Sequence, residues 1–320
     1  MMNKLLKNEQ GNMLVLSAIG LTFVIGFAAW AIDVGYVLTA NTQLQNAADA
    51  AALAGASGLI YSTNEATDRA IVFAGRNDCI NTPVQISPAN VTFPTATRIQ
   101  VRVTRDLPTF FMQAFGIPQL SITRQASADA GTLQGTSGMR PWGVPKFNWQ
   151  VGEAVVIKSG AVGAVGTEPS YFYPIDFPPI NRGTPETGAS VYEDNIRYGT
   201  AHWVYIGDVL QVEPGNKTGP TSQGITDLLG LDPNAFWAGD HVESSLFVGM
   251  SSPRVVKIPL YDPAYPPDSG RNEITCIGLA AFFIEGMQGK NVIGRFVKMI
   301  THGSYGSGGY SILYGVHLAQ

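Results

Sequence analysis

The hydrophobic positions begin with a continuous run from Met13 to Ile32 that contains no charged residue. At about 1.5 Å of rise per residue, a helix of this length spans ~30 Å, which is the thickness of a bilayer hydrocarbon core. The run therefore predicts a transmembrane helix. A cleaved secretory signal is the alternative, although its apolar core has only ~7–15 residues. Small-residue pairs such as Ala29 and Ala31 leave cleavage open, and we expect a retained anchor.

The charges on either side of this run predict its orientation. Lys4 and Lys7 precede it, Asp33 marks its end, and the next Lys or Arg is Arg69. Positive charge favours the cytoplasmic side of a membrane. We therefore expect residues 1–12 to be a cytoplasmic tail, 13–32 to be a single-pass span of the cytoplasmic (inner) membrane, and the rest of the chain to be extracytoplasmic.

Helix is still favoured after Asp33, through about Ala56, because Ala, Leu and Gln are strong helix formers. Here small or apolar residues recur at spacings of three, four and seven, which predicts an amphipathic helix with one small-residue face. This face either packs against the protein's own sheet or packs against other subunits and partner helices. Its residues are Val37, Ala40, Leu44, Ala48, Ala51 and Gly55.

The pattern then alternates in the manner of strands. Ile99, Val101 and Val103 are apolar and their neighbours are polar, which predicts a half-buried strand. Residues 106–115 predict a short helix, with Pro108 in its first turn and Gly116 at its end. A second strand is expected from Leu120 to Ala128. Residues 33–130 would then form a small α+β, pilin-like unit.

Residues 131–140 are rich in Gly, Thr and Ser and predict a linker. From 141 to 320, short apolar segments separated by Pro and Gly turns predict a mainly-β domain, either a sandwich or an irregular barrel. Short helices are expected at 223–229 and 234–237. The strands are expected at 154–157, 203–206, 209–212, 246–250, 254–260, 274–284, 292–300 and 311–318.

The composition narrows the function classes. Charged residues make up 14% of the chain, against about 25% in average soluble proteins, and the formal net charge is −4 with no Lys/Arg-rich run. Because nucleic acids are bound through clustered positive charge, they are excluded as expected partners. Together with the predicted elements, this composition leads us to expect an α+β, membrane-anchored protein.

The two cysteines, Cys79 and Cys276, do not form a C-x-x-C motif, so a zinc or redox site is not indicated. Outside the cytoplasm they could pair in a disulfide. The alternative is two buried thiols that act as small hydrophobic groups.

The sequence offers few candidates for a catalytic, metal-binding or ligand-binding site. His241 and Glu243 could share a strand face as metal ligands, but H-E-x-x-H is absent. Asp262, Asp268 and Glu273 could bind calcium or be solvated turn carboxylates. The aromatic groups around Tyr171–Tyr173 and at Tyr261 and Tyr265 would form either a contact surface or core. We predict no catalytic residue, cofactor or metal, and no enzyme activity. The other histidines are His202, His302 and His317.

The N-terminal sequence resembles the corresponding segment of TadG-like proteins of the Tad (Flp) pilus-assembly system. The matching marks are Glu9-Gln10-Gly11 before the apolar run, Asp33 at its end, and the Ala-rich block LQNAADAAALA that starts at Leu44. The resemblance covers residues 1 to about 60. It implies a membrane-anchored structural or assembly role, with the membrane and other pilus-assembly proteins or pilin as partners.

Two departures from related families limit this role. Prepilins have Glu five residues after the cleavage-site Gly, whereas Leu16 stands at that offset from Gly11. The D-x-S-x-S metal motif of longer TadG-like proteins is also absent. The alternatives are an anchored binding module or adhesin that uses 141–320, and a cell-surface hydrolase, which requires a pocket with a histidine or paired carboxylates.

Overall fold

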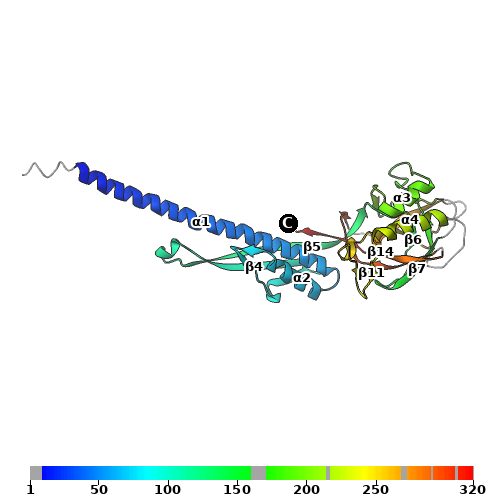
Figure 1. Ribbon diagram of the computed structural model, residues 1–320, viewed down its shortest axis with the longest axis horizontal. Helices are drawn as coiled ribbons and strands as arrows, with labels where there is room; N and C mark the ends of the chain where they lie inside the picture. Colours follow the sequence, from blue (N-terminus) through cyan, green and yellow to red (C-terminus); the bar gives the residue numbers. More distant parts are fainter. Residues whose placement is uncertain are drawn as a thin grey trace, which may run out of the picture. The chain divides into compact units, whose positions relative to one another are not determined.

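The structure is a computed structural model that describes residues 9–159, 171–213, 217–267, 272–289, 291–306 and 309–319. The fold is α+β, with a long apolar N-terminal helix and a mainly-β C-terminal region (Figure 1). The chain divides into two compact units. Unit 1 comprises Met1–Ala130 and Val316–Gln320, and unit 2 comprises Gly131–Gly315.

Unit 1 is built on α1, which runs from Glu9 to Leu59 without interruption. The hydroxyls of Thr22, Thr39 and Thr42 each donate a hydrogen bond to the carbonyl four residues earlier, so these polar side chains are satisfied within the helix. The helix therefore passes through Asp33 as one element, as its residue types predict.

A second helix, α2 (Thr63–Gly75), follows after a tight turn. Its N-cap is Ser62, whose Oγ accepts a hydrogen bond from the N–H of Glu65 at 3.1 Å. Ala66, Ala70 and Ala74 recur every four residues and are fully buried. At Gly58, a Cβ would lie 2.7 Å from the backbone of Ala66, so glycine permits the close approach of α1 and α2.

The rest of unit 1 is dominated by the hairpin of β4 (Arg98–Pro108) and β5 (Gln119–Thr136). Ile99, Val101 and Val103 are fully buried, which confirms the predicted strand. Arg98 also pairs with Asp129 across the hairpin, through N–O distances of 2.8 and 2.6 Å. The smaller elements are β1 (Asp78–Cys79), β2 (Thr82–Pro83), η1 (Pro88–Asn90), β3 (Val91–Thr95) and η2 (Met112–Phe115).

The short helix predicted over 106–115 is wrong. Residues 106–108 continue β4, because Asp106 pairs with Ser121 and Pro108 pairs with Gln119. Only Met112–Phe115 form a single 3-10 turn, and Gly116 ends it with a φ of 84°. The pairing of the two strands outweighs the local helix preference of this segment.

Unit 2 contains a closed barrel. The strands β14, β13, β6, β8, β7 and β15 pair in this order, and β15 pairs back with β14, so the barrel alternative of the sequence prediction is the one observed. Side chains of β13 and β14 are buried on both faces, in two hydrophobic clusters. The barrel strands are β6 (Trp142–Pro145), β7 (Ala154–Ser159), β8 (Tyr171–Pro174), β13 (Val255–Tyr261), β14 (Glu273–Gln288) and β15 (Asn291–Val297).

Two helices of unit 2 pack against the barrel, whereas most of its remaining strands pair outside the barrel. Tyr192 and Ile196 of α3, and Ile225 and Leu228 of α4, belong to the same hydrophobic cluster as Trp142 of β6. The helices are α3 (Ala189–Tyr198) and α4 (Thr218–Leu231), with a 3-10 turn η3 (Gly249–Ser251). The remaining strands are β9 (Val204–Tyr205), β10 (Val209–Gln211), β11 (Phe236–Trp237), β12 (Val242–Glu243), β16 (Met299–Ile300), β17 (Ser304–Tyr305), β18 (Tyr310–Ser311) and β19 (Leu313–Leu318).

Arg254 is a buried cation at the start of β13, with 5% of its surface exposed. Its guanidinium donates hydrogen bonds to the backbone carbonyls of Asp232 and Ala235 through Nη1, of Ile284 through Nε and of Glu285 through Nη2. Burial lowers the pKa of this guanidinium from its ordinary value. One side chain thus joins the end of α4 to strand β14.

Several predictions in this region are corrected. The linker over 131–140 is wrong, because β5 continues to Thr136 and Leu133 and Met139 are fully buried. The helix over 234–237 is wrong, since β11 lies there. No strand forms over 246–250, where the Ser244 hydroxyl accepts hydrogen bonds from the N–H groups of Leu246 and Phe247. The predicted helix 223–229 is confirmed as part of α4.

Candidate functional site

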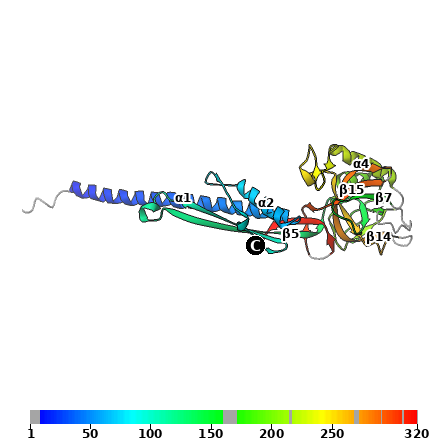
Figure 2. The ribbon, with the colours of Figure 1, turned by 90° about the horizontal axis from the view of Figure 1, so that it is seen from below.

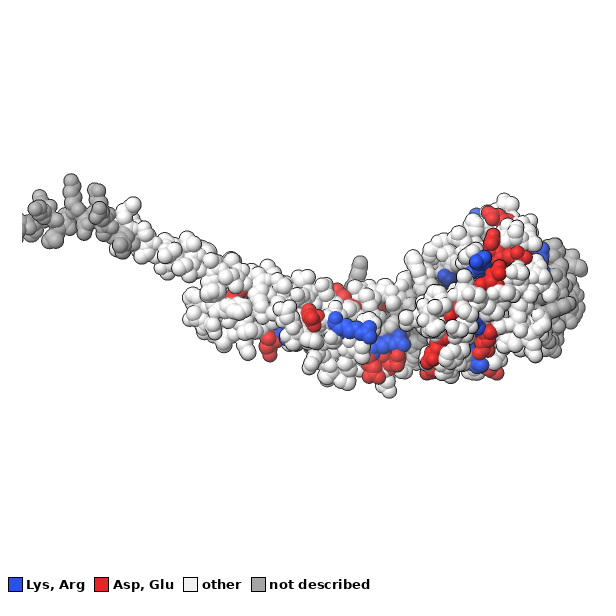
Figure 3. Space-filling model, in the orientation of Figure 1, with Lys and Arg blue, Asp and Glu red and all other residues white. Residues whose placement is uncertain are grey.

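The first part of the candidate site is the exposed N-terminal half of α1. Within the described residues, α1 is the helix that is long and apolar enough to cross a membrane, and no part of its most apolar stretch is buried. Large apolar side chains project all around it, among them Phe23, Phe27 and Trp30. We call this stretch, residues 13–32, the apolar arm. The visible face of this arm carries no charged side chain (Figure 3). An arm with this surface needs an apolar surrounding.

Asp33 ends this exposed stretch and is itself buried, with 1% of its surface exposed. Its Oδ1 accepts a hydrogen bond from the N–H of Phe110 at 2.8 Å. Its Oδ2 accepts from Phe111 at 3.0 Å and from Met112 at 2.7 Å. Successive N–H groups at the start of a helical turn lack partners within the turn and favour an anion. The carboxylate of Asp33 therefore caps η2.

This contact fixes the hairpin tip, which we define as Thr109–Pro118, to one level of α1. The ring of Phe110 also meets the ring of Tyr36 edge-on, with centroids 5.1 Å apart. Figures 1 and 2 show the hairpin running beside α1 with its tip toward the N-terminal half of the helix. The sequence placed Asp33 at the end of the span, but its partners lie 77 to 79 residues away and carry no local signal.

Replacing Asp33 with Ala should release the hairpin tip. Three backbone N–H groups would lose their acceptor, and we expect their hydrogen exchange to be faster by roughly tenfold or more, since local opening sets this rate. Hydrogen exchange of peptides that cover residues 109–118 measures the effect. The matched control is Asp49→Ala on the same helix, because Asp49 bonds the side chain of Gln45 within α1. Equal exchange in both variants would contradict the capping role.

The predicted packing face is covered by unit 1 itself. Leu44, Ala48 and Ala51 are fully buried, and α1 contacts α2, β1 and β4. A Cβ at Gly55 would overlap the Ile99 side chain of β4 and lie 3.2 Å from the Ala70 Cβ of α2. Of the two interpretations that the sequence left open, the structure therefore places the protein's own elements against this face.

Cys79 and Cys276 are both buried free thiols, Cys79 in unit 1 and Cys276 in unit 2. The structure thus contains no Cys79–Cys276 disulfide, and the alternative interpretation as buried thiols describes it. Burial raises the pKa of the Cys276 thiol to about 12, so this group is not a nucleophile at neutral pH.

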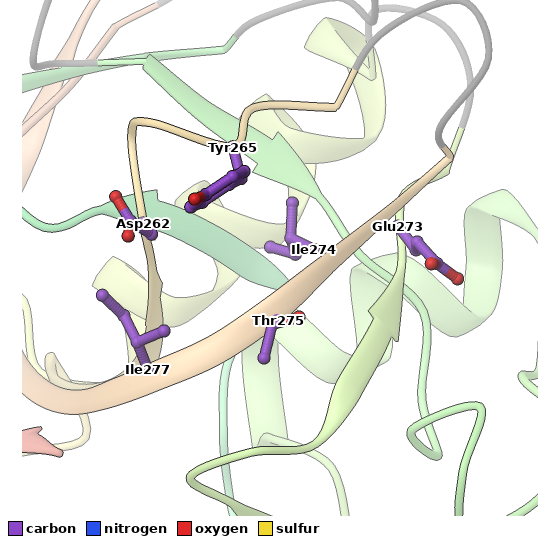
Figure 4. Close-up of a pocket in the computed structure, with 6 residues that line it drawn as sticks. All are labelled: Asp262, Tyr265, Glu273, Ile274, Thr275 and Ile277. Carbon is purple, nitrogen blue, oxygen red and sulfur yellow. The ribbon is translucent and has the colours of Figure 1, made fainter.

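The candidate metal ligands do not assemble a metal site in the described part of the chain, although His241 and Glu243 lie in contact. Among the described residues, no group of three His, Cys, Asp or Glu side chains could hold a metal ion. His241 contacts Asp240 and Glu243, and these contacts raise the pKa of its exposed imidazole. Asp262 and Glu273 line a hollow of about 460 Å³ but lie at opposite ends of it (Figure 4). Asp268 lies outside the described residues.

Most of the candidate aromatic residues belong to the core. Phe172, Tyr173 and Tyr261 are buried, whereas Tyr265 is exposed and lines the hollow beside Asp262 (Figure 4). The side chain of Tyr171 lies outside the described ones. Among the described side chains of this group, Tyr265 is the exposed one.

A buried carboxylate pair was not predicted. Asp176 and Glu213 are 3% and 6% exposed. Their two chain segments are joined by hydrogen bonds from the N–H of Asp176 to the Gln211 carbonyl and from the N–H of Glu213 to the Pro174 carbonyl. Glu213 pairs with Lys217 at 2.6 Å. Burial, together with the charge of Glu213, raises the pKa of Asp176 to about 7. Both carboxylates are therefore almost entirely shielded from solvent in the structure.

The raised pKa of Asp176 makes the stability of the folded chain depend on pH, and the sign of this dependence follows from the direction of the shift. An unfolded aspartate loses its proton near 3.8, while Asp176 in the folded chain keeps it until about 7. The folded state therefore holds the extra proton in this window, and its stability falls as pH rises through it. Asp176→Asn should be more stable than the natural chain at pH 8, by up to a few kcal/mol.

The measurement is the free energy of unfolding of unit 2, followed by tryptophan fluorescence, since Trp142, Trp149, Trp203 and Trp237 all lie in this unit. The advantage of Asp176→Asn should disappear well below pH 3.8, where Asp176 is protonated in both the folded and the unfolded chain. A difference that does not change with pH would contradict the raised pKa.

Comparison with known proteins gives one family match. No curated protein and no solved structure matched the chain. The matched residues include the exposed apolar arm, Asp33 and the buried small-residue face. Residues 11–58 match the Tad family, described as "Putative Flp pilus-assembly TadE/G-like", so the resemblance of the N-terminal segment to TadG-like proteins is confirmed.

Proposed function

We propose that this protein is a single-pass, membrane-anchored structural or assembly component of a Tad/Flp-type pilus system. Its N-terminus lies in the cytoplasm, α1 crosses the inner membrane as far as Asp33, and both units are extracytoplasmic. Its partners are the membrane and other pilus-assembly proteins or pilin. No catalysis is part of this role.

The observation that carries the proposal is the change of surface along α1. Before Asp33 the helix presents apolar side chains on every side and buries none of its most apolar stretch. After Asp33 the same helix buries a small-residue face within unit 1. This is the surface of a helix whose first half lies in lipid and whose second half is the core of a water-soluble unit. The Tad-family match spans both halves.

Membrane extraction tests the anchor. The full-length protein should stay with membranes through an alkaline wash and should need detergent for release. A double substitution, Leu21→Arg with Ile25→Arg, should move it out of this fraction, since each central Arg costs about 2.5–3.5 kcal/mol of insertion. The matched control is Leu38→Arg, which is also exposed on α1 but lies after Asp33. Full-length protein in the cytosol without detergent would refute the proposal.

Two further measurements test the orientation and the pilus role. Protease added outside the cytoplasmic membrane should digest a tag at the C-terminus and spare a tag at the N-terminus. Isolation of the tagged, detergent-extracted protein should recover pilus-secretion components, identified by mass spectrometry. A reversed protease pattern would refute the orientation, and a preparation without any pilus component would count against the assembly role.

A further inference from the structure

The tip of the β4–β5 hairpin carries exposed apolar side chains that unit 1 leaves uncovered. Phe115 is 85% exposed, and Phe110, Phe111 and Ile117 are each 40–49% exposed. No charged residue occurs between Asp106 and Arg124. A turn between two strands in water is ordinarily polar, so this composition indicates an apolar surrounding.

The level of the tip along α1 is fixed by Asp33. The carboxylate binds three N–H groups of the tip, and Tyr36 packs against Phe110. Asp33 is also the first charged residue after the apolar run. The tip is therefore held where the exposed arm ends, which is the boundary between hydrocarbon and headgroups if the arm spans the bilayer. With its charge bound by the tip, Asp33 can lie at this depth at a lower cost.

We infer that the hairpin tip is a second membrane contact, which inserts Phe111 and Phe115 into the outer boundary of the same bilayer that α1 crosses. Lipid is the occupant that the observations favour, because the apolar tip adjoins the apolar arm and lacks the charges that a polar partner would need. The two contacts would hold unit 1 at a set depth and limit the rotation of α1 about its axis. This inference rests on the membrane anchoring proposed above.

Spin labelling of the full-length chain in phospholipid vesicles tests the inference. A nitroxide is placed at Phe115→Cys or, in a second protein, at Phe111→Cys, and its collisions with oxygen and with a water-soluble nickel chelate are measured. Labels at Phe23→Cys and Arg102→Cys provide the lipid and water references. Arg102 is exposed on β4 and lies ~25 Å along the strand from Phe110. The unsubstituted chain, whose cysteines are buried, measures background labelling.

The expected result is a ratio of oxygen to nickel collisions that is higher at 115 and 111 than at 102 and lower than at 23, as for groups about 5–10 Å inside the headgroup boundary. Nickel access at 115 and 111 equal to that at 102, with 23 still in lipid, overturns this inference alone. Label–label broadening at 115 that dilution with unlabelled protein removes also overturns it, since the tip then contacts a second copy. A water-accessible label at 23 overturns the proposed anchoring as well.

Discussion

Replacing Ala48 with Lys is expected to unfold unit 1. Ala48 lies on the face of α1 that α2, β1 and β4 cover, and its neighbours Leu44 and Ala51 on that face are also fully buried. An ammonium at position 48 cannot reach water unless α1 separates from these elements. A buried charge without a partner costs about 3–5 kcal/mol, which is most of the stability of a unit of this size.

Hydrogen exchange of α2 and β4 is the measurement, since both should lose protection in Ala48→Lys. The matched control is Asn46→Lys, an exposed position on the same helix, where a change within about 0.5 kcal/mol is expected. Tryptophan fluorescence, which reports mainly on unit 2, should be the same in both variants. If α2 and β4 exchange in Ala48→Lys at the same rates as in the unsubstituted protein, the small-residue face is open in the folded protein.

The expected unfolding of unit 1 affects how a pilus-assembly defect in such variants is interpreted. The small-residue face of α1 is occupied within its own unit, so a pilus defect in Ala48→Lys or Ala51→Lys would report the loss of unit 1 and not the loss of a partner contact. Variants that test partner contacts should therefore be chosen among exposed residues of α1, such as Leu38.

The features predicted correctly from the sequence are those with a local pattern, either a continuous apolar run or a repeat at helix or strand spacing. The apolar run is continuous over the length of a membrane-spanning helix, and the small-residue face of α1 repeats at helical spacing. Ile99, Val101 and Val103 alternate at strand spacing. The segment from Ile274 to Ile284 is apolar on both faces because both sides of β14 are buried. In each case the residues that define the element lie within a few positions of one another.

The features that were missed depend on contacts between distant segments. Residues 106–108 become strand through pairing with 119–121, and the turn that follows is capped by Asp33. Likewise, Gly135 looks like part of a linker in the sequence, but a Cβ there would overlap the ring of Tyr205. Glycine at this position permits close packing, and composition alone does not distinguish that role from flexibility.

In the candidate site, too, the features with a local sequence pattern were predicted and those that depend on distant contacts were not. The position of Asp33 at the end of the span came from the pattern of charge, whereas its hydrogen-bond partners became visible only in the fold. The burial of Asp176 and Glu213 has no sequence signal at all, since neither residue lies in a charged or repeated motif. Their environment is set by strands and helices of unit 2 that meet only after folding.

Replacing Arg254 with Met is expected to give the largest loss of stability in unit 2. The guanidinium is 5% exposed and donates to four backbone carbonyls, those of Asp232, Ala235, Ile284 and Glu285. Met matches part of the volume but donates no hydrogen bond, so these buried acceptors would be left without this partner. Lys offers one ammonium and cannot reproduce the planar arrangement of donors, so Arg254→Lys should rescue little.

We expect Arg254→Met to lower the free energy of unfolding of unit 2 by about 3–5 kcal/mol, measured by denaturant titration of the detergent-solubilised full chain with tryptophan fluorescence. Arg197→Met is the matched control, because Arg197 is 39% exposed and lies 4.0 Å from its carboxylate partner Asp227, an arrangement worth less than about 1 kcal/mol. Since Arg254 joins the end of α4 to β14, the loss should be accompanied by faster hydrogen exchange in both elements. Equal stability of the two variants would show that the four carbonyls find other donors.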